Sequence, residues 1–145
     1  MKKKLILLVL MVFLTACQNT SVQKRELDKH VTLSFFYITT CQECKEFKKT
    51  AIPYLEDTFQ DQITINQYDL DASETEEVYD HVVDSLVDFD ESMYGYGPFI
   101  SVDGYFALLG YTLGDEKYLA DDIEKAVQNQ ELSDELSGMR FMYEK

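Results

Sequence analysis

An apolar run of residues leads directly into a pair of cysteines, and this junction limits the folds open to the chain. Residues 35–38 are Phe-Phe-Tyr-Ile, two threonines follow, and Cys41 and Cys44 then form a Cys-x-x-Cys pair. The apolar run is typical of a buried β-strand, and the residues after the pair keep a helical spacing of apolar side chains to about Phe59. The sequence therefore predicts a strand, a turn, two thiols and a helix start, in that order.

Two cysteines at this spacing suit thiol–disulfide chemistry. Unpaired backbone N–H groups and the helix dipole favour a thiolate at Cys41, and Cys44 is close enough to form a disulfide with it. A structural disulfide is one alternative, although so small a ring stabilises a fold little. A metal site is another, but it needs four ligands, and beyond the pair only His30 and His81 are at hand, without ligand spacing. The context of the motif favours the redox interpretation.

The N-terminus has the organisation of an export signal. Lys2, Lys3 and Lys4 precede residues 5–14, which are apolar but too few for a permanent membrane-spanning helix. The run ends in Leu14, and Thr15, Ala16 and Cys17 follow it. This order resembles the lipobox of bacterial lipoproteins. This resemblance implies a signal peptide over residues 1–16 and a diacylglycerol on Cys17, followed by a flexible tether to residue 29. A soluble secretory signal and an uncleaved anchor are the alternatives.

Charge and cysteine count agree with an anchored, extracytoplasmic protein. A lipid on Cys17 leaves one cysteine pair and no odd thiol in an oxidising compartment. The net charge of −14 becomes three units more negative when the signal peptide leaves, which excludes nucleic-acid partners and repels anionic lipid headgroups. The acyl chains would then hold the protein at the membrane. Lysines outnumber arginines, which favours an AT-rich genome such as that of a Gram-positive bacterium.

Residues 30–145 predict a single α/β domain. Strands are expected at 31–38, 63–70, 98–102 and 105–111, and helices at 41–59, 73–89 and 115–129. The order β-α-β-α-β-β-α predicts a four-stranded mixed sheet flanked by helices, with a right-handed crossover in its parallel pair. The segment 132–145 has no assigned element, and Met139, Phe141 and Met142 are its candidates to pack on the core.

Three local signals refine this prediction. Asp103-Gly104 predicts a hairpin turn in which both residues take positive φ. Ser73 and Glu76 have the spacing of a capping box and should begin the second helix. Pro53 lies inside the first helix and should kink it, because proline has no N–H to donate.

The predicted arrangement resembles the thioredoxin fold. The cysteine pair lies between the first strand and the first helix, where that family keeps its dithiol. Pro98 begins the strand after the second helix, where the family has a cis-proline facing the dithiol; a trans bond at an ordinary strand start is the alternative. Asp103-Gly104 and Gly110-Tyr111 match the hairpin turn and the glycine that ends the last strand. The chain is most similar to small extracytoplasmic thioredoxin-like proteins of Gram-positive bacteria, including the bacteriocin transport accessory group.

The chain also departs from that family. Thr40 stands where thioredoxin has a tryptophan, and Gln42-Glu43 stands where it has Gly-Pro. Phe35 replaces the buried aspartate under the dithiol, so the usual proton acceptor for the second cysteine is missing. Gly97 precedes Pro98 where the family has threonine, isoleucine or valine, which would leave more room beside the disulfide.

The resemblance implies a membrane-anchored thiol–disulfide oxidoreductase that acts on cysteines of exported proteins. Cys41 would react with the substrate and Cys44 would resolve the mixed disulfide, with no cofactor and with a membrane redox partner to recycle the pair. A non-catalytic accessory lipoprotein, a binding scaffold in secretion or in a surface complex, is the alternative. Tyr94 and Tyr96 are candidates to line a substrate groove beside Pro98. An acidic group near residues 69–77 is expected to be solvated charge, because its spacing fits no Ca²⁺ loop.

Overall fold

Strand β1 (Val31–Tyr37) runs through the interior of the sheet and is buried on both faces. The computed structural model describes residues 21–145. Phe35 and Phe36 are both fully buried, although consecutive side chains of a strand point to opposite faces of a sheet. Phe35 packs against Phe47 on one face, and Phe36 packs against Tyr79 on the other. Each face of the sheet therefore needs its own layer of helices.

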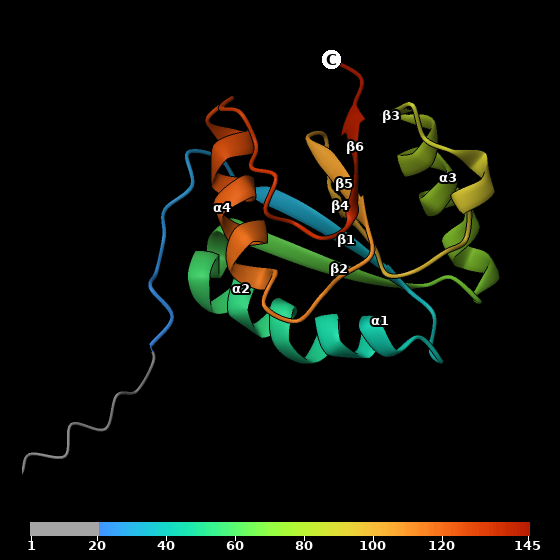
Figure 1. Cartoon of the computed structure of the whole chain (residues 1–145), viewed down its shortest axis with the longest axis horizontal. Helices are drawn as coiled ribbons and strands as arrows, with labels where there is room; N and C mark the ends of the chain where they lie inside the picture. The colour runs from blue at the N-terminus through green and yellow to red at the C-terminus, as the bar shows by residue number, and fades with distance from the viewer. Residues whose placement is uncertain (1–20) are drawn as a thin grey trace, which may run out of the picture.

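The sheet has six strands in the order β2-β1-β4-β5-β6-β3 (Figure 1). The other strands are β2 (Ile63–Asp69), β3 (Leu86–Val87), β4 (Phe99–Val102), β5 (Phe106–Leu109) and β6 (Met139–Tyr143). Strand β2 is parallel to β1 in an unbroken register, and all other neighbouring strands are antiparallel. The prediction of a mixed sheet in an α/β fold is confirmed, but the predicted number of four strands is wrong.

The two additional strands come from segments that the sequence pattern assigned differently. Residues 139–143 pair with β5 and bury Phe141, so this part of the C-terminal segment extends the sheet. Met139 and Met142 remain about half exposed, so only one of the three candidate side chains packs on the core. Leu86 and Val87 pair with β6, although their apolar spacing fits a helix. Helix α3 ends at Asp84, and backbone pairing with β6 holds Leu86 and Val87 in an extended strand.

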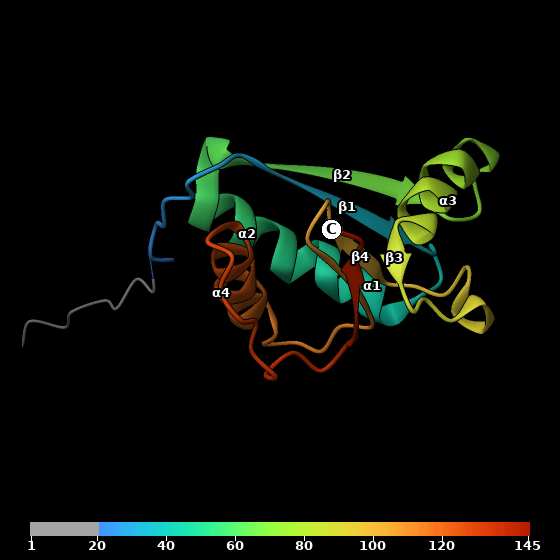
Figure 2. The same ribbon diagram turned by 90° about the horizontal axis from the view of Figure 1, so that it is seen from above.

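Helices cover both faces of the sheet (Figures 1 and 2). Helices α1 (Gln42–Glu46), α2 (Ile52–Phe59) and α4 (Glu116–Val127) lie on the Phe35 face, and α3 (Glu76–Asp84) lies on the Phe36 face. A π-helical segment, Phe47–Ala51, joins α1 to α2, and its end lies next to Pro53. There the N–H of Ile52 bonds to the carbonyl of Phe47, five residues back, so the expected irregularity takes the form of a π turn.

Two predicted details are wrong. No capping box begins α3: its N-cap is Thr75, which forms no side-chain hydrogen bond there, and a 3₁₀ turn, Ser73–Thr75, precedes it. In the β4–β5 hairpin only Gly104 has positive φ, and the N–H of Tyr105 bonds to the carbonyl of Val102. Asp103 keeps negative φ because one glycine is enough for a turn of this kind.

Part of the predicted flexible tether is packed on the domain. Leu27 is buried, and the side-chain amide of Gln62 bonds both its N–H and its carbonyl at 3.0 Å. The N–H of Arg25 bonds to the carbonyl of Thr58, and its guanidinium contacts carboxylates of α4. The domain therefore begins before residue 30, since Leu27 of this mostly polar stretch joins the core. The predicted signal peptide and Cys17 lie outside the described residues.

None of the helices within residues 21–145 is both long enough and apolar enough to cross a membrane.

A buried ion pair fastens the C-terminal segment to α4. Asp122 is fully buried, and its carboxylate accepts a hydrogen bond from the guanidinium of Arg140 at 2.6 Å and from the N–H of Ser133 at 2.9 Å. The same guanidinium donates to the carbonyl of Ser133. Strand β6 and the loop before it are therefore held to the helix layer by charge as well as by backbone pairing.

Asp103 forms a second polar cluster, on the Phe36 face of the sheet. Its carboxylate accepts hydrogen bonds from Ser34 at 2.9 Å and Ser101 at 2.6 Å, and Ser101 also bonds the hydroxyl of Tyr143. Burial raises the pKa of Asp103 above its ordinary value of 3.8, and this effect outweighs the two hydroxyl donors and the nearby His81, which all lower it.

We expect Arg140→Ala to lower the free energy of unfolding by about 3 kcal/mol, because it leaves the buried Asp122 carboxylate without its main partner. This value is at the lower end for a broken buried ion pair, since the ammonium of Lys125 stays 3.7 Å from the same carboxylate. Arg25→Ala is the control, since its partners are partly exposed and such surface pairs contribute about 0–1 kcal/mol. Urea unfolding of both variants measures the difference. Equal losses would contradict a special role for the buried pair.

The raised pKa of Asp103 predicts a pH dependence of stability with a definite sign. The folded state binds this proton more tightly than the unfolded chain does, so ionisation of Asp103 destabilises the fold. Its contribution to the free energy of unfolding should fall as pH rises from the ordinary value of 3.8 through the raised pKa, and then stay level. Other carboxylates titrate too, so the test is the difference between wild type and Asp103→Asn over the acid range. A difference independent of pH would show that the prediction is wrong.

Candidate functional site

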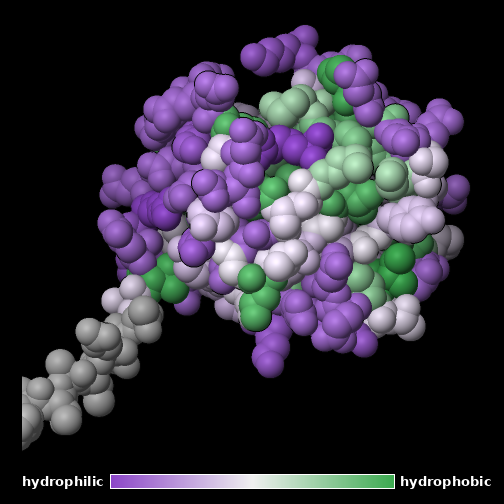
Figure 3. Space-filling model, viewed as in Figure 1, coloured by the Kyte–Doolittle hydropathy of each residue, from purple (hydrophilic) through white to green (hydrophobic). Residues whose placement is uncertain are grey.

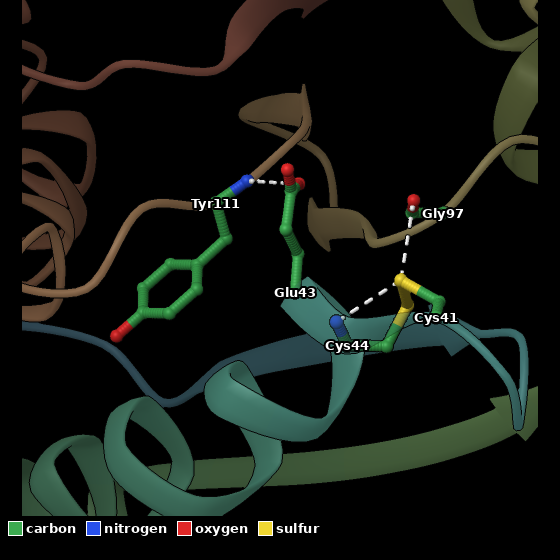
Figure 4. Close-up of a disulfide and its surroundings, with 5 residues drawn as sticks. All are labelled: Cys41, Glu43, Cys44, Gly97 and Tyr111. Carbon is green, nitrogen blue, oxygen red and sulfur yellow. Dashed lines mark hydrogen bonds between the residues drawn. A yellow bond between two sulfur atoms is a disulfide. The ribbon is translucent and has the colours of Figure 1, made fainter.

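The disulfide lies where β1 ends and the first helical stretch begins (Figure 4). After Tyr37 a turn is closed by a hydrogen bond from the N–H of Cys41 to the carbonyl of Ile38 at 3.0 Å. Cys41 is the N-cap of α1, and its sulfur accepts the N–H of Cys44 at 3.1 Å. The two cysteines form a disulfide with their Cα atoms 5.3 Å apart. The predicted order of strand, turn, cysteine pair and helix is confirmed.

The two sulfurs differ in their access to solvent. Cys44 is only 3% exposed and belongs to the core cluster on the Phe35 face, whereas Cys41 is half-buried at the rim. An incoming thiol can therefore approach Cys41 more easily than Cys44. This asymmetry matches the different roles that the sequence predicts for the two residues.

The loop before β4 passes directly over the disulfide. The Gly97 carbonyl oxygen lies 3.5 Å from the Cys41 sulfur, as Figure 4 shows, and a reduced Cys41 thiol could donate to it. A Cβ on Gly97 would lie 3.3 Å from the Cys44 sulfur, so glycine permits this close approach. Pro98 is buried, and the Gly97–Pro98 peptide bond is cis. The structure thus places Gly97, which is joined to Pro98 by the cis bond, beside the sulfurs of Cys41 and Cys44.

Charged side chains flank the disulfide on two sides. Glu43 accepts a hydrogen bond from the N–H of Tyr111 at 3.4 Å, which links α1 to the end of β5. On the other side, a hollow of about 250 Å³ is lined by Cys44, Lys45 and Lys48 of the helix and by residues 37–39 of the turn. The ammonium of Lys48 lies 4.9 Å from the centre of the Tyr37 ring. Positive charge therefore gathers beside the buried sulfur.

Tyr111 connects the helices next to the site, and the sequence pattern did not predict this role. Its ring packs edge-on against Phe47, and its hydroxyl donates to Glu116 at 2.7 Å and lies 2.8 Å from the hydroxyl of Thr50. Burial raises the pKa of the Tyr111 phenol, and the Glu116 carboxylate raises it further, so Tyr111 acts as a donor. The only sequence signal for this residue is the Gly110-Tyr111 match, because Thr50 lies 61 residues away in the chain and no local pattern marks the bond to Glu116.

The two tyrosines predicted to line a groove lie before the Gly97 loop but differ in their contacts. The Tyr94 hydroxyl donates to Asp80 of α3 at 2.5 Å, and this bond raises the pKa of Tyr94 to about 12. Tyr94 is thus tied to the Phe36 face. Tyr96 directly precedes Gly97 and is 60% exposed, so its ring is available to a bound chain.

Metal ligands do not gather in the part of the chain that the structure describes: it holds no group of three His, Cys, Asp or Glu side chains with metal-site geometry. His30 bonds Thr64, and His81 is exposed on α3. Most of the acidic residues between 69 and 77 are exposed.

Comparison of the chain with protein-family models, with curated proteins and with solved structures finds no match.

We expect Gly97→Val to destabilise the oxidised protein by about 1–3 kcal/mol, because the added methyl groups overpack the space beside the Cys44 sulfur. Gly97→Ala should have a smaller effect, since only one carbon has to be accommodated. Urea unfolding of the oxidised proteins gives both values. Wild-type stability in the valine variant would contradict the close packing described here.

Proposed function

We propose that this chain is a thioredoxin-like thiol–disulfide oxidoreductase, held on the outer side of the cell membrane by a lipid on Cys17. The observation that carries the proposal is a half-exposed Cys41 joined to a buried Cys44 at a helix start, beneath the Gly97 carbonyl. Its substrates are cysteines of exported proteins, and a membrane redox partner recycles it. The dithiol is its only redox group.

The proposed reaction follows from the difference between the two sulfurs. A substrate thiolate attacks the Cys41 sulfur; the Cys41–Cys44 bond breaks, a bond to the substrate forms, and Cys44 leaves as a thiolate. A second substrate thiolate then displaces Cys41, so the substrate gains a disulfide and the protein keeps two thiols. In the opposite direction, the Cys41 thiolate attacks a substrate disulfide, and Cys44 attacks the Cys41 sulfur to release the substrate.

Two local features stabilise the thiolates in this scheme. The N–H of Cys44 points at the Cys41 sulfur and would donate to it in the reduced form, where the charge makes the bond stronger. Lys45 and Lys48 line the hollow that reaches Cys44, so their charge favours the leaving thiolate there. These lysines supply positive charge at a site where Phe35 stands in place of an acidic residue.

The sheet supports the proposal. Strands β2, β1, β4 and β5 are adjacent in that order, with a parallel β1–β2 pair and an antiparallel β4–β5 hairpin, as the resemblance leads us to expect. Strands β6 and β3 extend this arrangement at one edge.

A non-catalytic accessory lipoprotein is the second candidate. The observation that favours it is the full burial of Phe35 against Phe47, so an apolar ring occupies the position where thioredoxin has its proton-accepting aspartate. In such a scaffold the disulfide would stabilise the rim of a binding surface in secretion or in a surface complex.

Cysteine variants test the proposal. Cys41→Ser should reduce thiol–disulfide exchange with a cysteine-containing model peptide to the uncatalysed rate, because the accessible sulfur is lost. Cys44→Ser should instead accumulate a mixed disulfide at Cys41, since the resolving thiol is gone. Mass spectrometry after acid quenching detects the adduct.

Cys17→Ser is the matched control. It removes the proposed lipid site and should leave exchange in solution unchanged. Wild-type function of the Cys41→Ser protein would contradict the oxidoreductase proposal and favour the scaffold.

A further inference from the structure

The N-terminal segment is fastened at the end of the domain that lies opposite the disulfide. Arg25 and Leu27 contact Thr58 and Gln62, at the C-terminal end of α2, whereas Cys41 lies at the start of α1. The helical stretch from α1 to α2 separates the two places by about 25 Å. Strand β1 starts beside the docked segment and ends before the turn to Cys41. It spans about 20 Å along the same axis of the domain. Figures 1 and 2 show the N-terminal segment leaving at the α2 end in both views.

The docked segment has the contacts of an integral part of the domain. Leu27 is 7% exposed, and the Gln62 side chain satisfies both of its backbone groups. Arg25 adds contacts to Asp121 and Glu124 of α4. Core burial, backbone hydrogen bonds and ion pairs hold this segment on the domain, so it adds no length to the tether. The tether from the lipid therefore ends at Arg25.

The length of chain between the proposed lipid and this point limits the reach of the domain. From Cys17 to Arg25, eight residue steps cover at most about 28 Å in any conformation. Lying on its side would press the acidic domain against the headgroups, and turning over to bring Cys41 down to the lipid surface would raise the attachment point by about 25 Å. The tether would then be almost fully extended, at a large cost in conformational entropy.

The negative charge of the domain also favours an orientation in which the disulfide is away from the bilayer. The domain is strongly acidic and is repelled by anionic headgroups. On the face seen in Figure 3, hydrophilic residues cover most of the α4 side, and the more hydrophobic ones gather toward β6 and α3. The side of the molecule that would face the bilayer is thus hydrophilic, and the net negative charge of the chain keeps it away from anionic headgroups.

We propose that the Cys41–Cys44 disulfide faces away from the bilayer and exchanges with thiols that stand about 25 Å or more above its surface. This inference rests on the lipid at Cys17, which is part of the proposed function. The redox partner is accordingly a protein whose cysteines lie on an aqueous domain that projects from the membrane. Cysteines at headgroup level, or inside the bilayer, are disfavoured as direct partners, because reaching them requires an almost fully extended tether.

The test measures the reach of Cys41 without requiring catalysis. Full-length lipidated Cys44→Ser protein is bound to vesicles of phosphatidylcholine with a minor fraction of phosphatidylglycerol. Its Cys41 thiol is then alkylated by a maleimide fixed to a lipid headgroup by a short spacer, or by a long polyethylene glycol spacer. Alkylation should be about tenfold or more slower with the short spacer, because a tether that cannot span a distance gives almost no effective concentration.

A variant with a longer tether provides the matched comparison. A Gly/Ser linker of about 20 residues between Gln23 and Lys24 leaves the docked segment intact and adds about 25 Å of root-mean-square reach. In this variant, most of the difference in alkylation rate between the short and the long spacer should disappear. Free maleimide should react with Cys41 at the same rate in both proteins.

The outcomes separate this inference from the proposed chemistry. Equal rates with both spacers in the protein of natural length would overturn the orientation, even if exchange catalysis is normal. Failure of the lipidated protein to form, or to bind vesicles, would overturn it as well. Slow alkylation with the short spacer, relieved by the linker, supports the orientation even where the cysteine variants show no catalysis.

Discussion

The burial of two consecutive phenylalanines on β1 is the constraint on which the rest of the structure depends. Phe35 and Phe36 are both inaccessible to solvent, and only a strand covered on both faces can hide neighbouring side chains in this way. Each contributes about 1.5–3 kcal/mol of apolar burial, and each requires a helix layer of its own. The end of this strand then sets where the turn and Cys41 can lie, so the position of the disulfide follows from the packing of the sheet.

Local sequence predicted the parts of the fold that neighbouring residues decide. The strand, turn, cysteine pair and helix start are of this kind, and so is the hairpin at Asp103-Gly104, although its φ angles differ from the expected ones. Strand β6 was not predicted, because it depends on pairing with β5 and on the Asp122–Arg140 contact, which join distant parts of the chain. The apolar spacing of Leu86 and Val87 fits a helix, and only their pairing with the distant strand β6 makes them a strand.

The candidate site divides in the same way. Cys41, Cys44 and Pro98 have recognisable sequence positions, whereas the contacts of Tyr111 with Thr50 and Glu116 become visible only in three dimensions. The docking of Leu27 was also not predicted, because Val22 and Leu27 alone, in an otherwise polar stretch, show no helical or strand periodicity. Leu27 nevertheless matters most for the proposed function, because it fixes the end of the domain from which the N-terminal segment leaves. Sheet packing and N-terminal docking together place the disulfide and the proposed anchor at opposite ends.

The central claim is that the Cys41–Cys44 pair is a working redox couple and not a structural cross-link. Its reduction potential tests this most directly, measured on the soluble domain from Asn19 onward by equilibration in glutathione and dithiothreitol buffers. We predict a value between about −270 and −120 mV, the range of functioning oxidoreductases, and its place in that range would give the direction of electron flow. A value well below about −300 mV would identify a stable structural disulfide and would contradict the account.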